Sequence, residues 1–177
     1  MAYCKIKSMI KERIIFIMGV SGSGKSTIGA LLGNALGYPF FDGDDYHPKE
    51  NIVKMEQGHP LNDSDRKGWL LALNQLAMDH LQHGAVIGCS ALKHSYREVL
   101  REGLGPSAVF VHLEGSSELI QQRMQQRSGH FMPLALLNSQ FETLEPPKNA
   151  MVVSIDKSPS EIVGHILSAL EHRKNGA

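Results

Sequence analysis

A short stretch near the start of the chain has residue types and spacing suited to holding phosphate groups. The pattern G-x-x-x-x-G-K-[ST] is filled at every fixed position by residues 19–26, which read Gly-Val-Ser-Gly-Ser-Gly-Lys-Ser. The stretch follows the apolar run 14–18 and opens an expected helix, which is the setting that a phosphate loop requires. Glycines let backbone N–H groups turn towards phosphate oxygens, and the start of the helix adds positive potential. We therefore expect a nucleotide-binding segment made of Gly19, Val20, Ser21, Gly22, Ser23, Gly24, Lys25, Ser26 and Thr27.

Two side chains of this segment have expected chemical roles. Lys25 would reach the β- and γ-phosphates of a nucleotide and act in catalysis, and the Ser26 hydroxyl would bind Mg²⁺. A glycine-rich turn without a ligand is the simple alternative. A dinucleotide site is rejected, because Thr27 stands where that motif needs glycine or alanine.

A second cluster, Asp42-Gly43-Asp44-Asp45, falls where a second strand would end. Parallel strands present their carboxyl ends to the ligand crevice, so Asp42 and Asp44 are expected near the phosphates. Their two-residue spacing places both side chains on one face of an extended segment. We expect Asp42 to hold the Mg²⁺ water shell, because the third apolar run ends in Gly88-Cys89-Ser90 without an aspartate. Asp44 would accept a proton from an attacking hydroxyl. A polar turn is the alternative.

Five cations have spacings that favour anion binding. Arg66 lies at an expected helix start, and Lys93 and Arg97 are four residues apart, so these three are candidates for binding a substrate carboxylate. Solvated helix faces are the alternative. Arg123 and Arg127 are also four residues apart, and from there they could reach the nucleotide. Arg127 is the candidate for stabilising charge on the transferring phosphoryl group.

Composition limits the classes of partner. The chain has 177 residues with 18 Lys plus Arg and 18 Asp plus Glu, so its formal net charge is zero. This balance argues against nucleic acid or an anionic membrane as the main partner. No run approaches the ~20 apolar residues that span a bilayer. Cys4 and Cys89 do not suggest a disulfide framework, which favours a reducing cytoplasm. His80 and His83 lack partners at ligand spacing, so we expect no metal site among the histidines.

Short apolar runs alternate with longer amphipathic ones along the chain. Expected strands are 14–18, 39–41, 85–89, 108–113 and 151–155. Expected helices are 25–36, 48–57, 66–81, 95–101, 117–127 and 159–172, with Ser64, Ser116 and Ser158 as caps of the third, fifth and last. Strands separated by helices imply parallel βαβ crossovers. We therefore expect one α/β domain in which a parallel sheet lies between two layers of helices.

Two segments stand outside this alternation. Residues 1–12 form a charged N-terminal tail. The region 128–147 contains a glycine, three prolines and the polar cluster Asn138-Ser139-Gln140. An insert at this place in such a fold is often a mobile lid, and a plain surface helix with loops is the alternative.

Several blocks of the chain resemble bacterial gluconate kinase, in order and over about residues 14 to 170. These blocks are 19–26, Asp-Gly-Asp-Asp-Tyr-His-Pro at 42–48, Asn-Ile-Val-Lys-Met at 51–55, Pro-Leu-Asn-Asp-Ser-Asp-Arg at 60–66 with Trp69-Leu70, Cys-Ser-Ala-Leu-Lys at 89–93 with Tyr96-Arg97, Gly-His-Phe-Met at 129–132, and Ser-Gln-Phe-Glu-Thr-Leu-Glu at 139–145. The phosphate loop is common to many families, whereas the later blocks are more specific. The resemblance implies transfer of the ATP γ-phosphate to the 6-hydroxyl of D-gluconate, a fold like that of shikimate kinase and nucleoside monophosphate kinases, a lid and a homodimer.

Similarity to shikimate kinase also implies residue roles. Asp42 matches an aspartate of the Mg²⁺ shell, and Asp44 matches a substrate-binding aspartate. Arg66 falls near a carboxylate-binding arginine. Arg123 would stack on adenine and Arg127 would contact phosphate. One departure from the pattern is Lys67-Gly68, which replaces a proline often found before the tryptophan, and we expect it to affect only local helix geometry.

Two rival interpretations remain at the level of the sequence. One is a related kinase acting on another small molecule, such as shikimate or a nucleoside monophosphate. The other is a nucleotide-dependent switch without transfer, in which Asp44, Lys93 and Arg97 would be dispensable.

Overall fold

Five parallel strands form the centre of the computed structural model, which describes residues 13–126 and 134–172. The strands are β1 (Ile14–Met18), β2 (Phe40–Asp42), β3 (Ala85–Gly88), β4 (Ala108–Glu114) and β5 (Met151–Ser154). Their order in the sheet is β2-β3-β1-β4-β5, so the first strand lies in the middle. Every neighbouring pair is parallel. The expected α/β class with a parallel sheet is confirmed.

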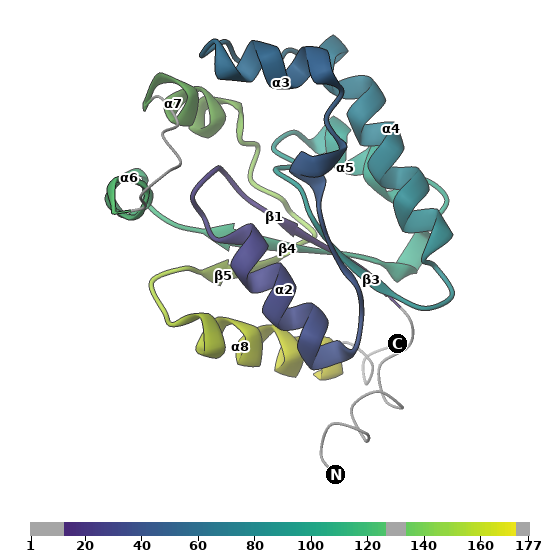
Figure 1. Ribbon diagram of the computed structural model, residues 1–177. Helices are drawn as coiled ribbons and strands as arrows, with labels where there is room; N and C mark the ends of the chain where they lie inside the picture. The colour runs from purple at the N-terminus through teal and green to yellow at the C-terminus, as the bar shows by residue number, and fades with distance from the viewer. Residues whose placement is uncertain (1–12, 127–133, 173–177) are drawn as a thin grey trace.

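Helices cover both faces of this sheet (Figure 1). They are α2 (Lys25–Leu36), α3 (Lys49–Glu56), α4 (Asp63–Asp79), α5 (His94–Arg101), α6 (Ser117–Gln125), α7 (Leu134–Thr143) and α8 (Pro159–His172), with short 3-10 turns η1 (Gly43–Tyr46) and η2 (Gly105–Ser107). The core on one face includes Leu32 of α2 and Ile166 of α8, and the core on the other includes Leu73 of α4 and Leu100 of α5. The three-layer architecture predicted from the sequence is therefore present.

Strand β1 shows why the sequences of the central strands are continuous apolar runs. All of its residues are buried. Ile15 and Ile17 belong to the core on the α2–α8 face, whereas Ile14, Phe16 and Met18 belong to the core on the α4–α5 face. Successive side chains of a strand point to opposite faces, so a strand covered on both sides is apolar at every position.

The start of α4 corrects one prediction. The helix begins at Asp63, not at Arg66, and its cap is Asn62 instead of Ser64. The Asn62 side chain accepts a hydrogen bond from the Asp65 backbone N–H at 2.8 Å, and the Asp65 carboxylate accepts one from the Asn62 N–H at 2.8 Å. This reciprocal capping box satisfies the N–H groups of Asn62 and Asp65, which a cap at Ser64, two residues later, would leave open. As a result, Asp63 lies in the first turn of the helix.

The other two predicted caps are confirmed. Ser116 Oγ accepts from the Leu119 N–H at 3.2 Å at the start of α6. Ser158 Oγ accepts from the Glu161 N–H at 3.4 Å, while the Glu161 carboxylate accepts from the Ser158 N–H at 3.0 Å. Pro159 therefore stands at the first position of α8, where a missing N–H costs nothing.

The region 128–147 contains α7, and residues 128–133 lie outside the described part of the chain. Leu136 and Leu137 of α7 are buried, and Leu137 belongs to the core on the α2–α8 face. Figure 1 shows α7 beside α3 at one end of the molecule. Within the described ranges, no helix has the length and apolar content needed to cross a bilayer.

Candidate active site

The phosphate loop connects β1 to α2 in the predicted way. Gly19 and Gly24 have φ angles of 145° and 98°, which a side chain would strain, so glycine is required at both ends of the loop. Gly24 precedes the first residue of α2 and offers no side-chain cap, which leaves the N–H groups of the first turn directed at the loop. The Lys25 ammonium donates to the carbonyls of Gly19 at 3.1 Å and Val20 at 3.0 Å. It therefore lies folded over the loop that a phosphate would occupy.

The structure brings the two candidate metal ligands together. Ser26 Oγ donates to Asp42 Oδ2 at 2.6 Å, from the first turn of α2 to the end of β2. The other carboxylate oxygen of Asp42 accepts from the Asp44 N–H at 3.1 Å and caps η1. This hydroxyl and carboxylate supply hard oxygen donors of the kind that Mg²⁺ prefers. Among the described residues there is no cluster of three or more His, Cys, Asp or Glu side chains that could hold a metal by itself.

The charges of both Lys25 and Arg66 act on the carboxyl of Asp44. Its side chain remains accessible to solvent, but the protein atoms around it displace enough water to raise the pKa of the carboxyl above its ordinary value. Lys25 opposes this rise, Asp42 and Asp45 add to it, and Arg66 opposes it again. Asp44 thus interacts with the lysine of the phosphate loop and with an arginine of α4.

A histidine that the sequence analysis did not single out lies beside this aspartate. His47 stacks on Trp69, with ring centroids 4.2 Å apart and an interplanar angle of 15°. Burial, with a smaller effect of Arg66, lowers the pKa of His47 to about 4, so its ring is neutral near pH 7. The Trp69 indole also donates to the Gly43 carbonyl at 2.7 Å. Trp69 is a buried core residue, and its bond to Gly43 fixes the segment that carries Asp44.

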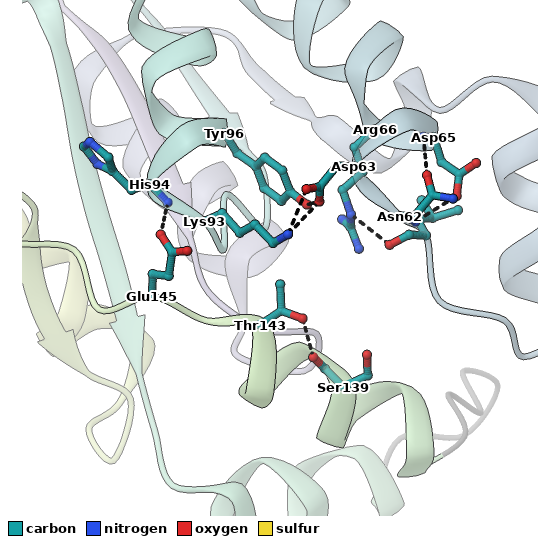
Figure 2. Close-up of polar contacts among 11 residues, drawn as sticks. Asn62, Asp63, Asp65, Arg66, Lys93, His94, Tyr96, Ser139, Thr143 and Glu145 are labelled. Atoms are coloured by element: carbon teal, nitrogen blue, oxygen red, sulfur yellow. Dashed lines mark hydrogen bonds and ion pairs between the residues drawn. The ribbon is translucent and has the colours of Figure 1, made fainter.

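Two predicted substrate-binding cations meet between α4 and α5 (Figure 2). Lys93 Nζ lies 2.7 and 3.0 Å from the carboxylate oxygens of Asp63, and the Tyr96 hydroxyl donates to the same carboxylate. Arg66 and Lys93 lie over the Tyr96 ring, at 5.7 and 5.5 Å from its centroid. Hydrogen bonds from Lys93 and Tyr96 lower the pKa of Asp63, and the bond to Asp63 raises the pKa of Lys93. The spacing from 63 to 96 gives no sign of this cluster, so sequence reasoning missed Asp63 and Tyr96.

The third predicted substrate cation has other partners. Arg97 is 5% exposed, and its guanidinium donates to the carbonyls of Ala91 and Leu92 at 2.9 and 3.0 Å. It also donates to the Glu145 carbonyl at 3.1 Å. Ala91 has a φ angle of 46°, unusual for a residue with a side chain, and Arg97 holds this turn in place. The structure therefore places Arg97 beneath the loop that carries Lys93, apart from Arg66 and Asp44.

A cavity of about 350 Å³ adjoins the phosphate loop on the nucleotide side. Ser23, Gly24 and Thr27 line it together with Arg123 of α6 and Lys157, which precedes α8. Arg123 also donates to the Ile155 carbonyl. Arg123 is therefore next to the phosphate loop, as predicted, whereas Arg127 lies outside the described residues.

A second, small cavity lies between α3 and α7. Its lining includes Met55 of α3, Arg66 of α4 and Leu92. Three residues of α7 also line it: Ser139, Gln140 and Thr143. Figure 2 shows the Arg66 side chain extending towards Ser139 of α7, whereas Lys93 extends towards Asp63. We refer to this space as the α3–α7 cavity.

Fold and site together define a class of protein. The middle strand of the parallel sheet runs into a phosphate loop, Ser26 and Asp42 form a hydroxyl–carboxylate pair, and Arg66 and Lys93 form a cationic cluster. These are the parts of a phosphate-loop kinase of small molecules. The family model for shikimate kinase matches residues 21–171, so the chain belongs to this class.

Relatives narrow the class further. A probable gluconokinase of Rattus norvegicus is 46% identical in an alignment 180 positions long, which covers 89% of this chain and 97% of the rat protein. A thermoresistant gluconokinase of Escherichia coli (strain K12) is 45% identical over 171 residues, spanning 93% and 95%. The crystal structure of a gluconokinase from Sinorhizobium meliloti 1021 has a TM-score of 0.85 and 43% identity, covering 94% of this chain and 95% of that one. The chain belongs to the gluconokinase family.

Proposed function

We propose that this chain is a kinase that transfers the γ-phosphate of ATP to the 6-hydroxyl of D-gluconate. The observation that carries the proposal is the position of Asp44, whose N–H donates to the Asp42 carboxylate that Ser26 at the end of the phosphate loop also contacts. The charges of Lys25 and Arg66 both act on the Asp44 carboxyl. A donor phosphate and an acidic acceptor would meet at this carboxylate. The gluconokinase relatives, at 45–46% identity over nearly the whole chain, support gluconate as the acceptor.

The donor half would bind ATP through the backbone N–H groups of the phosphate loop. Lys25 would exchange its two carbonyl partners for the β- and γ-phosphate oxygens. Ser26 and Asp42 are the residues that would hold Mg²⁺, which neutralises charge on the β- and γ-phosphates when bound. Arg123 would stack on adenine in the 350 Å³ cavity, where it lies beside Thr27. Arg127 keeps its predicted role at the transferring phosphoryl group.

The acceptor half would hold gluconate by its carboxylate. Arg66 and Lys93 supply two positive charges on neighbouring elements, and Asp63 keeps the Lys93 ammonium in place until a substrate carboxylate shares it. We give Arg97 a positioning role instead of the predicted substrate contact, because its guanidinium is buried and bound to three carbonyls.

Asp44 would act on the reacting hydroxyl. The gluconate 6-oxygen attacks the γ-phosphorus, the bond to the β–γ bridging oxygen breaks, and ADP leaves. The hydroxyl proton passes to the Asp44 carboxylate and from there to water. The raised pKa of this carboxyl suits it to accept the proton better than an ordinary aspartate would.

Several narrower expectations belong to the same proposal. We propose a homodimer in the cytoplasm, with ATP and Mg²⁺ as its required small molecules, a single domain, and a lid in the region 128–147. These rest on the resemblance and the composition described above. The likeness to bacterial members in particular stays a prediction, because rat and E. coli proteins match at nearly equal identity.

The test is ATP consumption measured against gluconate, other aldonates, shikimate and nucleoside monophosphates. We expect turnover with gluconate and little with the others. Strong turnover on shikimate with none on gluconate would replace the acceptor. ATP binding without transfer to any acceptor would favour the switch interpretation.

A further inference from the structure

A side chain of helix α7 is hydrogen-bonded to the phosphate loop. Gln140 Oε1 accepts a hydrogen bond of 2.7 Å from the backbone N–H of Ser21. Ser21 lies in the middle of the phosphate loop, and Gln140 is half-buried. Gln140 belongs to the block Ser-Gln-Phe-Glu-Thr-Leu-Glu at 139–145, to which the resemblance assigns no residue role. This contact gives one of its residues a direct connection to the nucleotide side of the molecule.

Gln140 also belongs to the wall of the α3–α7 cavity. It lines this cavity together with Ser139 and Thr143, opposite Arg66 of α4. The Thr143 hydroxyl donates to the Ser139 carbonyl at 2.7 Å, so the Thr143 side chain is held against the helix. One glutamine therefore contacts the loop that would bind ATP and faces the space beside the cations that would bind gluconate.

The other end of α7 is tied to the segment that carries Lys93. Just after α7, the Glu145 N–H donates to the Leu92 carbonyl at 2.9 Å. Its carboxylate accepts from the His94 N–H at 2.6 Å, as Figure 2 shows, and its carbonyl accepts from Arg97 at 3.1 Å. Leu144 packs against the cores on both faces of the sheet. The 134–145 segment thus connects the phosphate loop to the acceptor cations through a short, well-anchored helix.

We propose that Gln140 is a positioning residue that couples the two substrate sites. Because Gln140 binds the Ser21 N–H, a change in the position of the phosphate loop moves α7 and therefore changes the wall of the α3–α7 cavity. A nucleotide that orders this loop thereby orders the gluconate site as well, and each substrate strengthens the binding of the other by the same factor. This inference rests on the proposed function, because it requires gluconate and ATP as the two ligands.

The experiment compares gluconate binding in the presence and absence of a nucleotide. Calorimetry measures the gluconate Kd of the full chain alone and with saturating Mg²⁺ and AMP-PNP, a non-hydrolysable ATP analogue. For the unaltered chain we expect AMP-PNP to lower this Kd by about fivefold or more, the usual scale of coupling between sites. In Gln140→Leu, which keeps the volume of the side chain but loses the acceptor oxygen, the change should shrink to less than about twofold.

The matched control is Gln75→Leu, on the exposed face of α4. Gln75 makes a surface hydrogen bond of 2.8 Å to Asp79, one turn away on the same helix. This variant should keep the full effect of AMP-PNP on gluconate binding. Melting temperatures of all variants show whether each is folded, and Gln140→Asn, whose shorter amide cannot reach Ser21 from the same backbone, replaces Gln140→Leu if the latter unfolds.

The outcomes separate the two proposals. A folded Gln140 variant with the full effect of AMP-PNP, or an unaltered chain without any effect, would overturn the coupling role while gluconate turnover persists. An unaltered chain that neither binds nor phosphorylates gluconate would overturn the proposed function, and the coupling role with it. A merely structural role for Gln140 would lower the melting temperature and leave the effect of AMP-PNP unchanged.

Discussion

The nucleotide half and the acceptor half of the site are built in different ways. The nucleotide half comes from one continuous segment, 19–27, and it uses backbone groups whose directions follow from glycine and from the start of a helix. The acceptor half gathers side chains from α4, the start of α5 and α7, which lie far apart in the chain. Charged residues of both halves, Lys25 and Arg66, act on the Asp44 carboxyl. A phosphate-binding site can therefore be formed by one short segment of sequence, whereas the choice of acceptor depends on how several helices pack together.

The largest expected effect is the loss of the donor half. Lys25→Ala removes the ammonium that would neutralise charge on the β- and γ-phosphates, so kcat/KM should fall by about 10³-fold. A coupled assay of ADP release measures it. Lys67→Ala, at an exposed position of α4, is the matched control and should stay near the unaltered rate. Near-normal turnover in Lys25→Ala would contradict the kinase mechanism altogether.

The second largest effect is expected at Asp44. Asp44→Asn removes the proton acceptor but keeps the size of the side chain, so kcat should fall by about 10²-fold or more. The KM for ATP should change little, because Asp44 is not part of the phosphate loop. Asp45→Asn, an exposed neighbour, is the control. Unchanged kcat in Asp44→Asn would remove Asp44 from the chemical step.

The pH profile of the unaltered chain tests the same residue. The proposed base is the ionised Asp44, and its pKa is raised, mainly by burial. As pH falls, kcat/KM for gluconate should therefore begin to decline at a higher pH than an ordinary aspartate would give. This acid limb should be missing from the residual activity of Asp44→Asn. An identical limb in both proteins would assign it to another group.

A smaller effect should be confined to the acceptor half. Arg66→Met and Lys93→Met should each raise the KM for gluconate roughly tenfold or more, since a charge-assisted hydrogen bond contributes about 1.5–3 kcal/mol. The KM for ATP should stay within about twofold of the unaltered value. Lys49→Met, at an exposed position of α3, is the control. Equal changes in both KM values would mean that the two halves are not separate binding sites.

The smallest effect concerns the element that positions the acceptor half. Asn62→Ala removes one partner of the capping box of α4 and should lower the free energy of unfolding by about 1 kcal/mol. Ser64→Ala, the alternative cap suggested by the sequence, should change it by no more than a few tenths of a kcal/mol. Chemical denaturation followed by circular dichroism compares the two. The reverse order would restore Ser64 as the cap.

Much of the fold could be predicted from the sequence because its signals are local. The strands in the middle of the sheet are buried on both faces, and continuous apolar runs such as 14–18 report this directly. The helix caps at Ser116 and Ser158 can also be predicted from the sequence, because each hydroxyl accepts a hydrogen bond from an N–H group only three residues later. The start of α4 was misplaced because three capping residue types occur in a row at 62–64, and only the observed bonds of Asn62 decide among them.

The sequence by itself determined the phosphate loop, its following helix and the paired Asp42 and Asp44, because backbone geometry and strand ends are set within a few residues. Only the tertiary structure decided which distant cations face the acceptor. Lys93 and Arg97 are four residues apart in the sequence, but the Arg97 guanidinium is buried against backbone carbonyls whereas Lys93 contacts Asp63. Nothing in the sequence around Gln140 indicates that its side chain accepts a hydrogen bond from the Ser21 N–H. The physical reason is that long-range contacts depend on the packing of whole helices, which no short pattern of residues encodes.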